Sequence, residues 1–165
     1  MRHTKTIAFA VLAFLTSCGK QAAIQIDTLE NMRPLLSGTF EKKPWVPVSA
    51  RAFASPRFNP KPEIQIYNTA IPAGRECDEL WMPTTPASRL TFSSGNLDTG
   101  VIEQPITIWT KFNETAPGSI SASASMRATY KAEILISDPD SITVYIDFRS
   151  ENDGVYGHFR AKLCN

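Results

Sequence analysis

The fold of this chain is decided by residues 142–163, whose sequence is ITVYIDFRSENDGVYGHFRAKL. On both sides of Asp153-Gly154, apolar and polar residues alternate, a pattern typical of strands with one buried face. The Asp-Gly pair itself favours a two-residue hairpin turn. The stretch therefore predicts an antiparallel hairpin, whose buried face carries Ile142, Val144, Ile146 and Phe148 from one strand and Val155, Gly157, Phe159, Ala161 and Leu163 from the other.

The predicted turn also sets the pairing of the two strands. With Asp153-Gly154 as a two-residue loop, Asp147 lies opposite Arg160 and Phe148 lies opposite Phe159. A cross-strand pair of opposite charge contributes roughly 0.2–1 kcal/mol. We therefore interpret Asp147 and Arg160 as a structural contact and not as a catalytic one.

Similar alternation extends through most of the chain, in segments 36–40, 45–53, 64–67, 90–92, 106–109, 119–126 and 134–136. Turn residues separate these segments every 8 to 12 positions or so, which is typical of a sandwich or barrel. Glu41-Lys42-Lys43-Pro44 is expected to be a hairpin loop. We therefore predict one all-β domain over residues 33–165, an antiparallel β-sandwich or barrel-like sandwich of about eight to ten strands.

Proline is distributed unevenly along the chain. Of the twelve prolines, eight lie between Pro44 and Pro86. Proline cannot donate a hydrogen bond to a sheet, so it is found mainly at edges and in connections. The first half is thus expected to hold long loops and edge strands, and the half after Pro105 the regular sheet.

The N-terminus has the parts of a secretion signal. Arg2 and Lys5 precede an unbroken apolar run at residues 7–15, IAFAVLAFL. A membrane-spanning helix needs about 20 apolar residues, so this run is too short to span but fits the core of a signal peptide. Residues 1–17 are predicted to be a signal peptide that is removed. The alternative is an ordinary secreted protein that is cleaved nearby.

The residues that follow the apolar run, Leu15-Thr16-Ser17-Cys18, resemble the bacterial lipobox. In proteins with this motif, the cysteine thiol receives a diacylglycerol, the signal is cut off before the cysteine, and acyl chains such as palmitate anchor the protein to a membrane. Two or more chains anchor stably. We predict a lipidated Cys18 and a tether over residues 18–32. Gly19, in place of the aspartate that retains such proteins, favours the outer over the inner membrane.

Composition argues against several classes of partner. Without Arg2 and Lys5, the chain has 15 basic and 16 acidic side chains. A charge near −1 with no basic run disfavours a nucleic-acid partner. We find no phosphate-binding loop, cofactor motif or metal-ligand set, and predict no cofactor and no metal ion.

Two cysteines, Cys77 and Cys164, remain once Cys18 is acylated. An even pair in an oxidising compartment favours a disulfide. The competing interpretation is two separate buried thiols, which the acidic neighbours of Cys77 disfavour.

One resemblance extends over most of the chain. Ser37-Gly38-Thr39-Phe40, Lys43-Pro44-Trp45 and Ser49-Ala50-Arg51-Ala52-Phe53, together with the closing pattern Gly157, Phe159, Ala161, Leu163, Cys164, resemble a group of uncharacterised secreted lipoproteins of Gram-negative bacteria. Lys42 stands where that group usually has a glycine. The resemblance implies an all-β, lipid-tethered domain and no particular activity.

Candidate catalytic residues are few. His158 lies on the predicted polar face of its strand and is expected to be exposed, with no nucleophile motif to accompany it. Glu76, Asp78 and Glu79 form one acidic cluster, which a glycan hydrolase or a calcium site could use. The segment 137–141 (SDPDS) is better explained as a turn.

Trp81, between Leu80 and Met82, is the candidate partner contact. An exposed Leu-Trp-Met patch would suit a binding partner, whereas a loop folded back onto the sheet would bury the indole. The serine row Ser119, Ser121, Ser123, Ser125 is interpreted as the solvent side of a strand, with a flat recognition face as the alternative.

Taken together, these observations predict an envelope-anchored lipoprotein with a non-catalytic binding or assembly-support domain, whose partner could be a protein or a glycan. The alternatives are a carboxylate-dependent glycan hydrolase, with Glu76, Asp78 or Glu79 near a cleft, and a purely structural surface protein.

Overall fold

The computed structural model describes residues 35–102, 107–112, 120–125, 129–149 and 153–165, with the side chains of 121–130 left aside. The described residues belong to one compact unit, Pro34–Asn165. The predicted signal peptide, the lipidated Cys18 and the tether therefore lie outside the described residues, as does Ser119.

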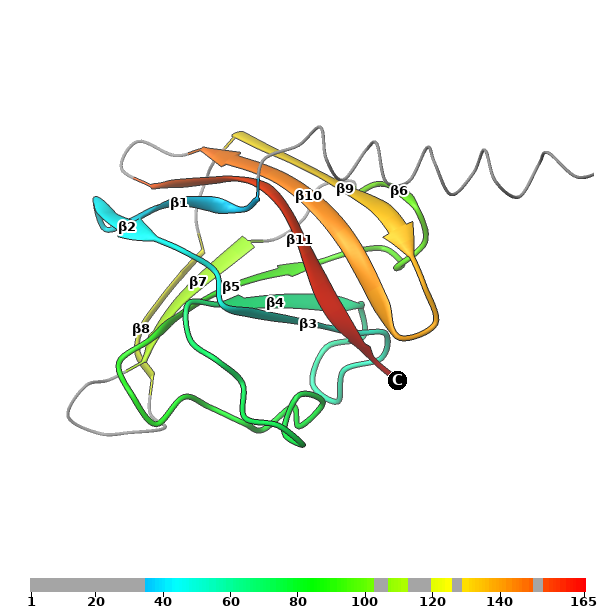
Figure 1. Cartoon of the computed structure of the whole chain (residues 1–165), viewed down its shortest axis with the longest axis horizontal. Helices are drawn as coiled ribbons and strands as arrows, with labels where there is room; N and C mark the ends of the chain where they lie inside the picture. Colours follow the sequence, from blue (N-terminus) through cyan, green and yellow to red (C-terminus); the bar gives the residue numbers. More distant parts are fainter. Residues whose placement is uncertain (1–34, 103–106, 113–119, 126–128, 150–152) are drawn as a thin grey trace, which may run out of the picture. The chain divides into compact units, whose positions relative to one another are not determined.

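The described residues form eleven strands and no helix, which confirms the all-β prediction (Figure 1). The strands are β1 (Ser37–Phe40), β2 (Lys43–Trp45), β3 (Ser49–Phe53), β4 (Glu63–Tyr67), β5 (Ser88–Ser93), β6 (Gly100–Val101), β7 (Thr107–Phe112), β8 (Ile120–Ser125), β9 (Thr129–Ser137), β10 (Ser141–Arg149) and β11 (Gly154–Cys164).

All the strands belong to one curled sheet, a half-barrel. Its order is β6-β9-β10-β11-β3-β4-β5-β7-β8, and the small β1–β2 hairpin adds to β11. β11 joins the two parts of the curled sheet. Most of its length pairs antiparallel with β10, and its last residues pair parallel with β3. As Figure 1 shows, β9 and β10 thereby lie across from β4, β5 and β7.

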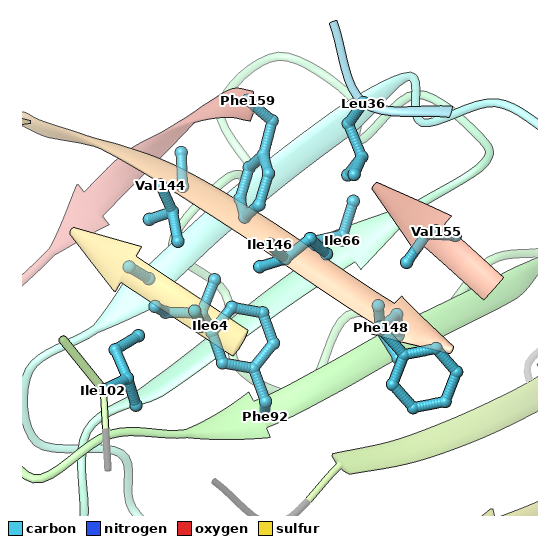
Figure 2. Packing of buried hydrophobic residues seen from close by; sticks show 14 of the residues in the cluster. Leu36, Ile64, Ile66, Phe92, Ile102, Val144, Ile146, Phe148, Val155 and Phe159 are labelled. Carbon is cyan, nitrogen blue, oxygen red and sulfur yellow. The ribbon is translucent and has the colours of Figure 1, made fainter. Parts of the chain in front are cut away.

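The main core fills the concave side of this sheet. Ile146 and Phe148 of β10 belong to one buried cluster with Ile64 and Phe92 of β4 and β5, which Figure 2 shows from close by. All four side chains are fully buried. The alternation in the sequence thus puts one face of each strand out of water, and this burial is the main force that holds the curl closed.

The C-terminal hairpin has the predicted faces but not the predicted pairing. Asp147 lies opposite Tyr156 and Phe148 opposite Val155, so the pairing with Arg160 and Phe159 was wrong. Gly154 belongs to β11, and residues 150–153 connect the strands, of which 150–152 lie outside the described residues. A shift by an even number of positions keeps every side chain on its face, which is why the burial pattern was still right.

The Asp153 side chain forms a hydrogen bond that the predicted turn does not include. Its Oδ1 accepts the backbone N–H of Glu41 at 2.6 Å, in the turn of the β1–β2 hairpin. Asp147 instead pairs with Arg149 at 2.7 Å, and Arg160 pairs with Asp138 at 3.3 Å. Asp153 thus connects the β10–β11 connection to the turn of the β1–β2 hairpin.

The β1–β2 turn is shorter than predicted. It consists of Glu41 and Lys42 alone, with φ angles of 52° and 62°, and Lys43-Pro44 already belongs to β2. Two residues with positive φ form the turn type that matches the twist of a hairpin.

The first half also differs from its expected layout. β3, β4 and β5 occupy the centre of the sheet order, so the prediction of edge strands was wrong for these three. The predicted long connections are present, at residues 54–62 and 68–87, and β2 is an edge strand. The prolines of this region lie in the segments between the strands, except for Pro44, whose strand β2 pairs with β1 alone. Central strands without proline keep all their ladder donors.

Candidate functional site

The segment between β4 and β5, residues 68–87, covers part of the outer face of the sheet, and we call it the covering segment. Tyr67, Trp81, Ala87 and Phe112 form a second apolar cluster between this segment and the strands. The outer face here is therefore buried, which explains why β4 has buried side chains on both faces, Ile64 and Ile66 on one and Gln65 and Tyr67 on the other.

A disulfide fastens the covering segment to the end of the chain. Cys77 and Cys164 are bonded, with their Cα atoms 5.3 Å apart and a separation of 87 positions in sequence. Cys77 is exposed, whereas Cys164 is buried at the end of β11. The predicted bridge is confirmed, and it attaches the proline-rich segment to the last strand.

Arg51, in the middle of β3, is the second fastening and is fully buried. Its Nε donates to Gln65 Oε1 at 2.8 Å, and one Nη donates to the Tyr67 hydroxyl at 2.9 Å. The other Nη donates to the carbonyl oxygens of Asp78 at 2.7 Å and Glu76 at 3.3 Å. The fork of one guanidinium thus joins β3, β4 and the covering segment.

The charge of Arg51 is stabilised mainly by dipoles and aromatic faces. Burial lowers the pKa of Arg51, and the neighbouring Tyr67 acts in the opposite direction. The guanidinium carbon lies 5.0 Å from the ring centre of Phe53, 5.4 Å from that of Tyr67 and 5.7 Å from that of Trp81. Aromatic faces attract a cation, and the attraction grows when water is excluded. Arg51 is therefore a structural cation.

Trp81 is an anchor of the covering segment and not a surface contact. Its exposed fraction is 8%, and its ring packs edge-on against Tyr67 with centroids 5.3 Å apart. The prediction of Trp81 as a partner contact was wrong, and the alternative of a loop folded onto the sheet is confirmed. The reason is that the indole, but not its neighbours, points toward the sheet: Leu80 and Met82 remain 61% and 38% exposed.

Leu80 and Met82 border a groove of about 400 Å³. From one segment it is lined by Pro56, Asn59 and Phe58, which is 75% exposed, and from the covering segment by Glu79, Leu80 and Met82. The floor consists of outer-face side chains of the sheet, namely Phe53, Glu63, Gln65 and Arg89. We call it the Phe58 groove. Clustered exposed apolar side chains of this kind mark interaction sites.

Two carboxylates line the Phe58 groove. Glu63 accepts from the Gln65 amide at 2.5 Å and the Asn59 amide at 3.4 Å, and Glu79 accepts the backbone N–H of Arg57 at 2.7 Å. Neither carboxylate forms an ion pair with a basic side chain of the described residues. The groove thus combines an apolar rim with hydrogen-bonding groups on its floor, as ligand sites generally do.

The rest of the acidic cluster serves the covering segment. The Arg75 side chain donates to Asp78 at 2.8 Å and lowers the pKa of that carboxyl. The pKa of Glu76 is also lowered, by its own backbone N–H and by Lys162 at 4.0 Å. A glycosidase acid needs a raised pKa, so both residues are tuned in the opposite direction.

The other acidic segment is a turn, as predicted. Asp138 donates its backbone N–H to the Ser141 carbonyl at 2.8 Å, and the Asp140 carbonyl accepts from Leu163 at 2.8 Å. Within the described ranges, no group of three or more histidine, cysteine or acidic side chains is placed to hold a metal ion.

His158 is half-buried, and so less exposed than predicted. Its carbonyl accepts from Leu36 N–H at 2.9 Å, and its Nδ1 is buried with no hydrogen-bond partner among the described residues. The reason is that β1 and the segment before it lie against β11. Of the serine row, Ser121, Ser123 and Ser125 belong to β8, an outermost strand of the sheet order, but their side chains are not described.

No protein-family model, curated protein or solved structure matches the chain. The part of the chain that the structure describes contains no helix long and apolar enough to cross a membrane.

Proposed function

We propose that this protein is a lipid-anchored envelope protein whose β domain is a non-catalytic binding module, with the Phe58 groove as its binding surface. The observation that carries the proposal is the gathering of Phe58, Leu80 and Met82 around one hollow. These apolar side chains come from two segments that are distant in sequence. A disulfide fastens the covering segment, and the Phe58 segment is held by hydrogen bonds from the Arg57 backbone N–H to Glu79 and from Asn59 to Ser93. Such preorganisation lowers the entropic cost of binding a partner.

The envelope location is supported by the chemistry of the cysteines. Disulfides persist in oxidising compartments such as the periplasm and the cell surface. The Cys77–Cys164 bond supports such a compartment, and Cys18, after its charged and apolar leader, is the proposed lipid attachment site. With Gly19 next to it, the proposal extends to the outer membrane.

The competing function is a carboxylate-dependent glycan hydrolase. Such an enzyme needs two carboxyl groups across a groove, one of them a proton donor. Of the three acidic residues that the sequence suggested, Glu79 lines the groove, whereas Glu76 and Asp78 hold the covering segment. Glu63 is the second carboxylate of the groove, and both Glu63 and Glu79 already accept hydrogen bonds from neighbouring amides. Binding is favoured because apolar side chains dominate the rim. A purely structural role is disfavoured by the presence of the groove itself.

Anchorage is tested by Cys18→Ala with Ser17→Ala as its control, because alanine keeps position 17 small and the lipobox intact. Mass spectrometry of the wild type and of Ser17→Ala should show an N-terminal cysteine that carries acyl chains, and both should fractionate with the outer membrane. Cys18→Ala should be released or stay uncleaved. A Cys18→Ala protein of normal mature size that remains in the membrane would contradict lipidation.

Binding is tested by a photo-crosslinking amino acid at position 58, in cells. The same group at position 101 serves as the control, because Val101 is 67% exposed but lies on β6, outside the groove. We expect discrete adducts at position 58 that disappear when Leu80→Asp is added. Equal labelling at positions 58 and 101 would mean that the groove is not a binding surface. Glu79→Gln separates binding from glycan cleavage, because it removes a carboxylate that a hydrolase would need and should leave the adducts at position 58 unchanged.

A further inference from the structure

A second apolar area lies at the point where the described chain begins. Leu35, Val46 and Val48 are 75%, 61% and 59% exposed. Together with Pro47 they border a hollow of about 270 Å³, whose polar edge is formed by Ser49, His158 and Arg160. We call Leu35, Val46, Pro47 and Val48 the aliphatic patch. None of its four side chains is charged, and clustered exposed apolar side chains mark interaction sites.

The position of the patch along the chain indicates what covers it. Leu35 belongs to the patch, and the proposed lipid attachment site, Cys18, lies a short distance upstream. Segment 18–34 spans on the order of 55 Å even when fully extended, so a lipid on Cys18 keeps the patch close to a bilayer. Such tethering raises the effective concentration of membrane, and weak apolar contacts then suffice for binding.

The edge of the patch suits the headgroup region of a bilayer. Arg160 has a 63% exposed side chain and lies beside the hollow, where its guanidinium also contacts Asp138 and Ser141. An apolar surface bordered by a cationic side chain is the pattern of proteins that lie in a membrane interface.

We propose that the aliphatic patch inserts into the interface of the bilayer in which the Cys18 lipid is anchored, so that the domain has a fixed orientation. This inference rests on the proposed lipidation. β3 connects the two surfaces: Ser49 and Ala50, at its start, line the hollow of the patch, and Phe53, at its end, lines the Phe58 groove. Membrane contact at one end of β3 leaves the groove open to a partner.

The test uses the lipidated full chain in vesicles of phosphatidylethanolamine and phosphatidylglycerol, with a tryptophan introduced as Val48→Trp. The native residues Trp45, Trp81 and Trp109 are at most 8% exposed, so the new indole reports on the patch. Lipids with brominated acyl chains quench an indole that lies at the level of the chains. We expect a blue-shifted emission and a roughly twofold loss of the added fluorescence, because interfacial side chains reach the acyl boundary.

Phe58→Trp is the matched control, since Phe58 is as exposed as Leu35 but belongs to the groove. Its fluorescence should not respond to bromine. If Val48→Trp alters the fold, Val46→Trp, elsewhere in the patch, takes its place and should show the same blue shift and quenching. Equal quenching at positions 48 and 58, or a blue shift at 48 without quenching, would overturn the membrane contact while leaving the anchor intact. Protein that fails to float with the vesicles would overturn the anchor and this inference together.

Discussion

The two halves of this domain are stabilised by different means. β9, β10 and β11 form long antiparallel ladders, and their inner side chains, such as Ile146 and Phe148, are buried by simple alternation. β3, β4 and β5 are shorter, and the proline-rich covering segment lies over them. That segment is held by one disulfide, one buried guanidinium and one indole. Where the chain cannot add hydrogen-bonded strands, it uses a few strong side-chain contacts instead.

The comparison predicts how each half responds to damage. Loss of one contact in a ladder leaves many others in place, whereas each fastening of the covering segment is a large part of what holds it. The Phe58 groove depends on these fastenings, because Glu79, Leu80 and Met82 of the covering segment line it. Binding and local stability should therefore be lost together in this half.

Removing the disulfide should have the largest effect. The chain-entropy model assigns about 4–5 kcal/mol to a bridge that closes a loop of this length. The double variant Cys77→Ala, Cys164→Ala should lose free energy of unfolding of this order in chemical denaturation. Amide exchange should accelerate first in residues 68–87 and not in β10.

Reductant is the control for the disulfide. It should destabilise the wild-type protein to the level of the double variant and leave the double variant unchanged. Uniformly faster exchange in β10 and the covering segment would contradict the separate fastening of the latter.

Arg51→Met should have the next largest effect. It removes a donor to the buried Gln65 Oε1 and to the half-buried carbonyls of Glu76 and Asp78, and an unsatisfied buried group costs about 1–3 kcal/mol. We expect a loss of about 3 kcal/mol and a red-shifted emission from Trp81 as the segment loosens. Arg51→Lys should recover only part of the loss, because an ammonium lacks the planar fork.

The exposed Arg149 provides the control for Arg51. It pairs with Asp147 at the surface, where solvent screens the attraction, so its loss should change the free energy of unfolding little. If Arg149→Met destabilised the domain as much as Arg51→Met, the burial of Arg51 would not be the cause.

Gly38→Ala tests the attachment of the β1–β2 hairpin to the ladder half. A Cβ at position 38 would collide with the carbonyl of Gly154 and the side chain of Val155 on β11. Overpacking of this kind costs about 1–3 kcal/mol. Gly95→Ala is the control, because a Cβ there meets nothing within 4 Å, and its effect should stay within about 0.5 kcal/mol. Equal melting temperatures of the two variants would refute the close approach.

The faces of the strands were predictable from the sequence, but the partners of the fastenings were not. Alternation alone identified Ile142, Ile146 and Phe159 as buried, because burial depends on the pleat. The pairing was wrong, because the side chain of Asp153 bonds a second hairpin that the local turn pattern does not include. Local rules therefore give the faces reliably and the connections less so.

Arg51 shows the limit of sequence patterns most clearly. An arginine between two alanines in a strand is ordinarily an exposed residue. Its burial follows from carbonyls more than twenty positions away. The groove was found in part: Leu80 and Met82 stood beside the predicted Trp81, whereas Phe58 joins them through tertiary packing alone. The one available signal was a proline-rich segment with two bulky apolar residues next to a tryptophan.

The smallest predicted effect is a gain. Lys42 has a φ of 62° in the β1–β2 turn, a conformation that costs an L-residue with a side chain roughly 1–2 kcal/mol and glycine almost nothing. Its exposed side chain makes no hydrogen bond or ion pair with the described residues, so nothing is lost with it. After the greater entropy of an unfolded glycine is subtracted, Lys42→Gly should stabilise the domain by about 0.5–1 kcal/mol.

Lys43→Gly, one position on in β2, should destabilise it by a similar amount, because a strand residue with ordinary φ gains nothing from glycine. Thermal unfolding of the two variants against the wild type measures both changes. Opposite signs at adjacent lysines would show that the turn conformation is responsible, and a destabilising Lys42→Gly would mean that the turn does not require positive φ.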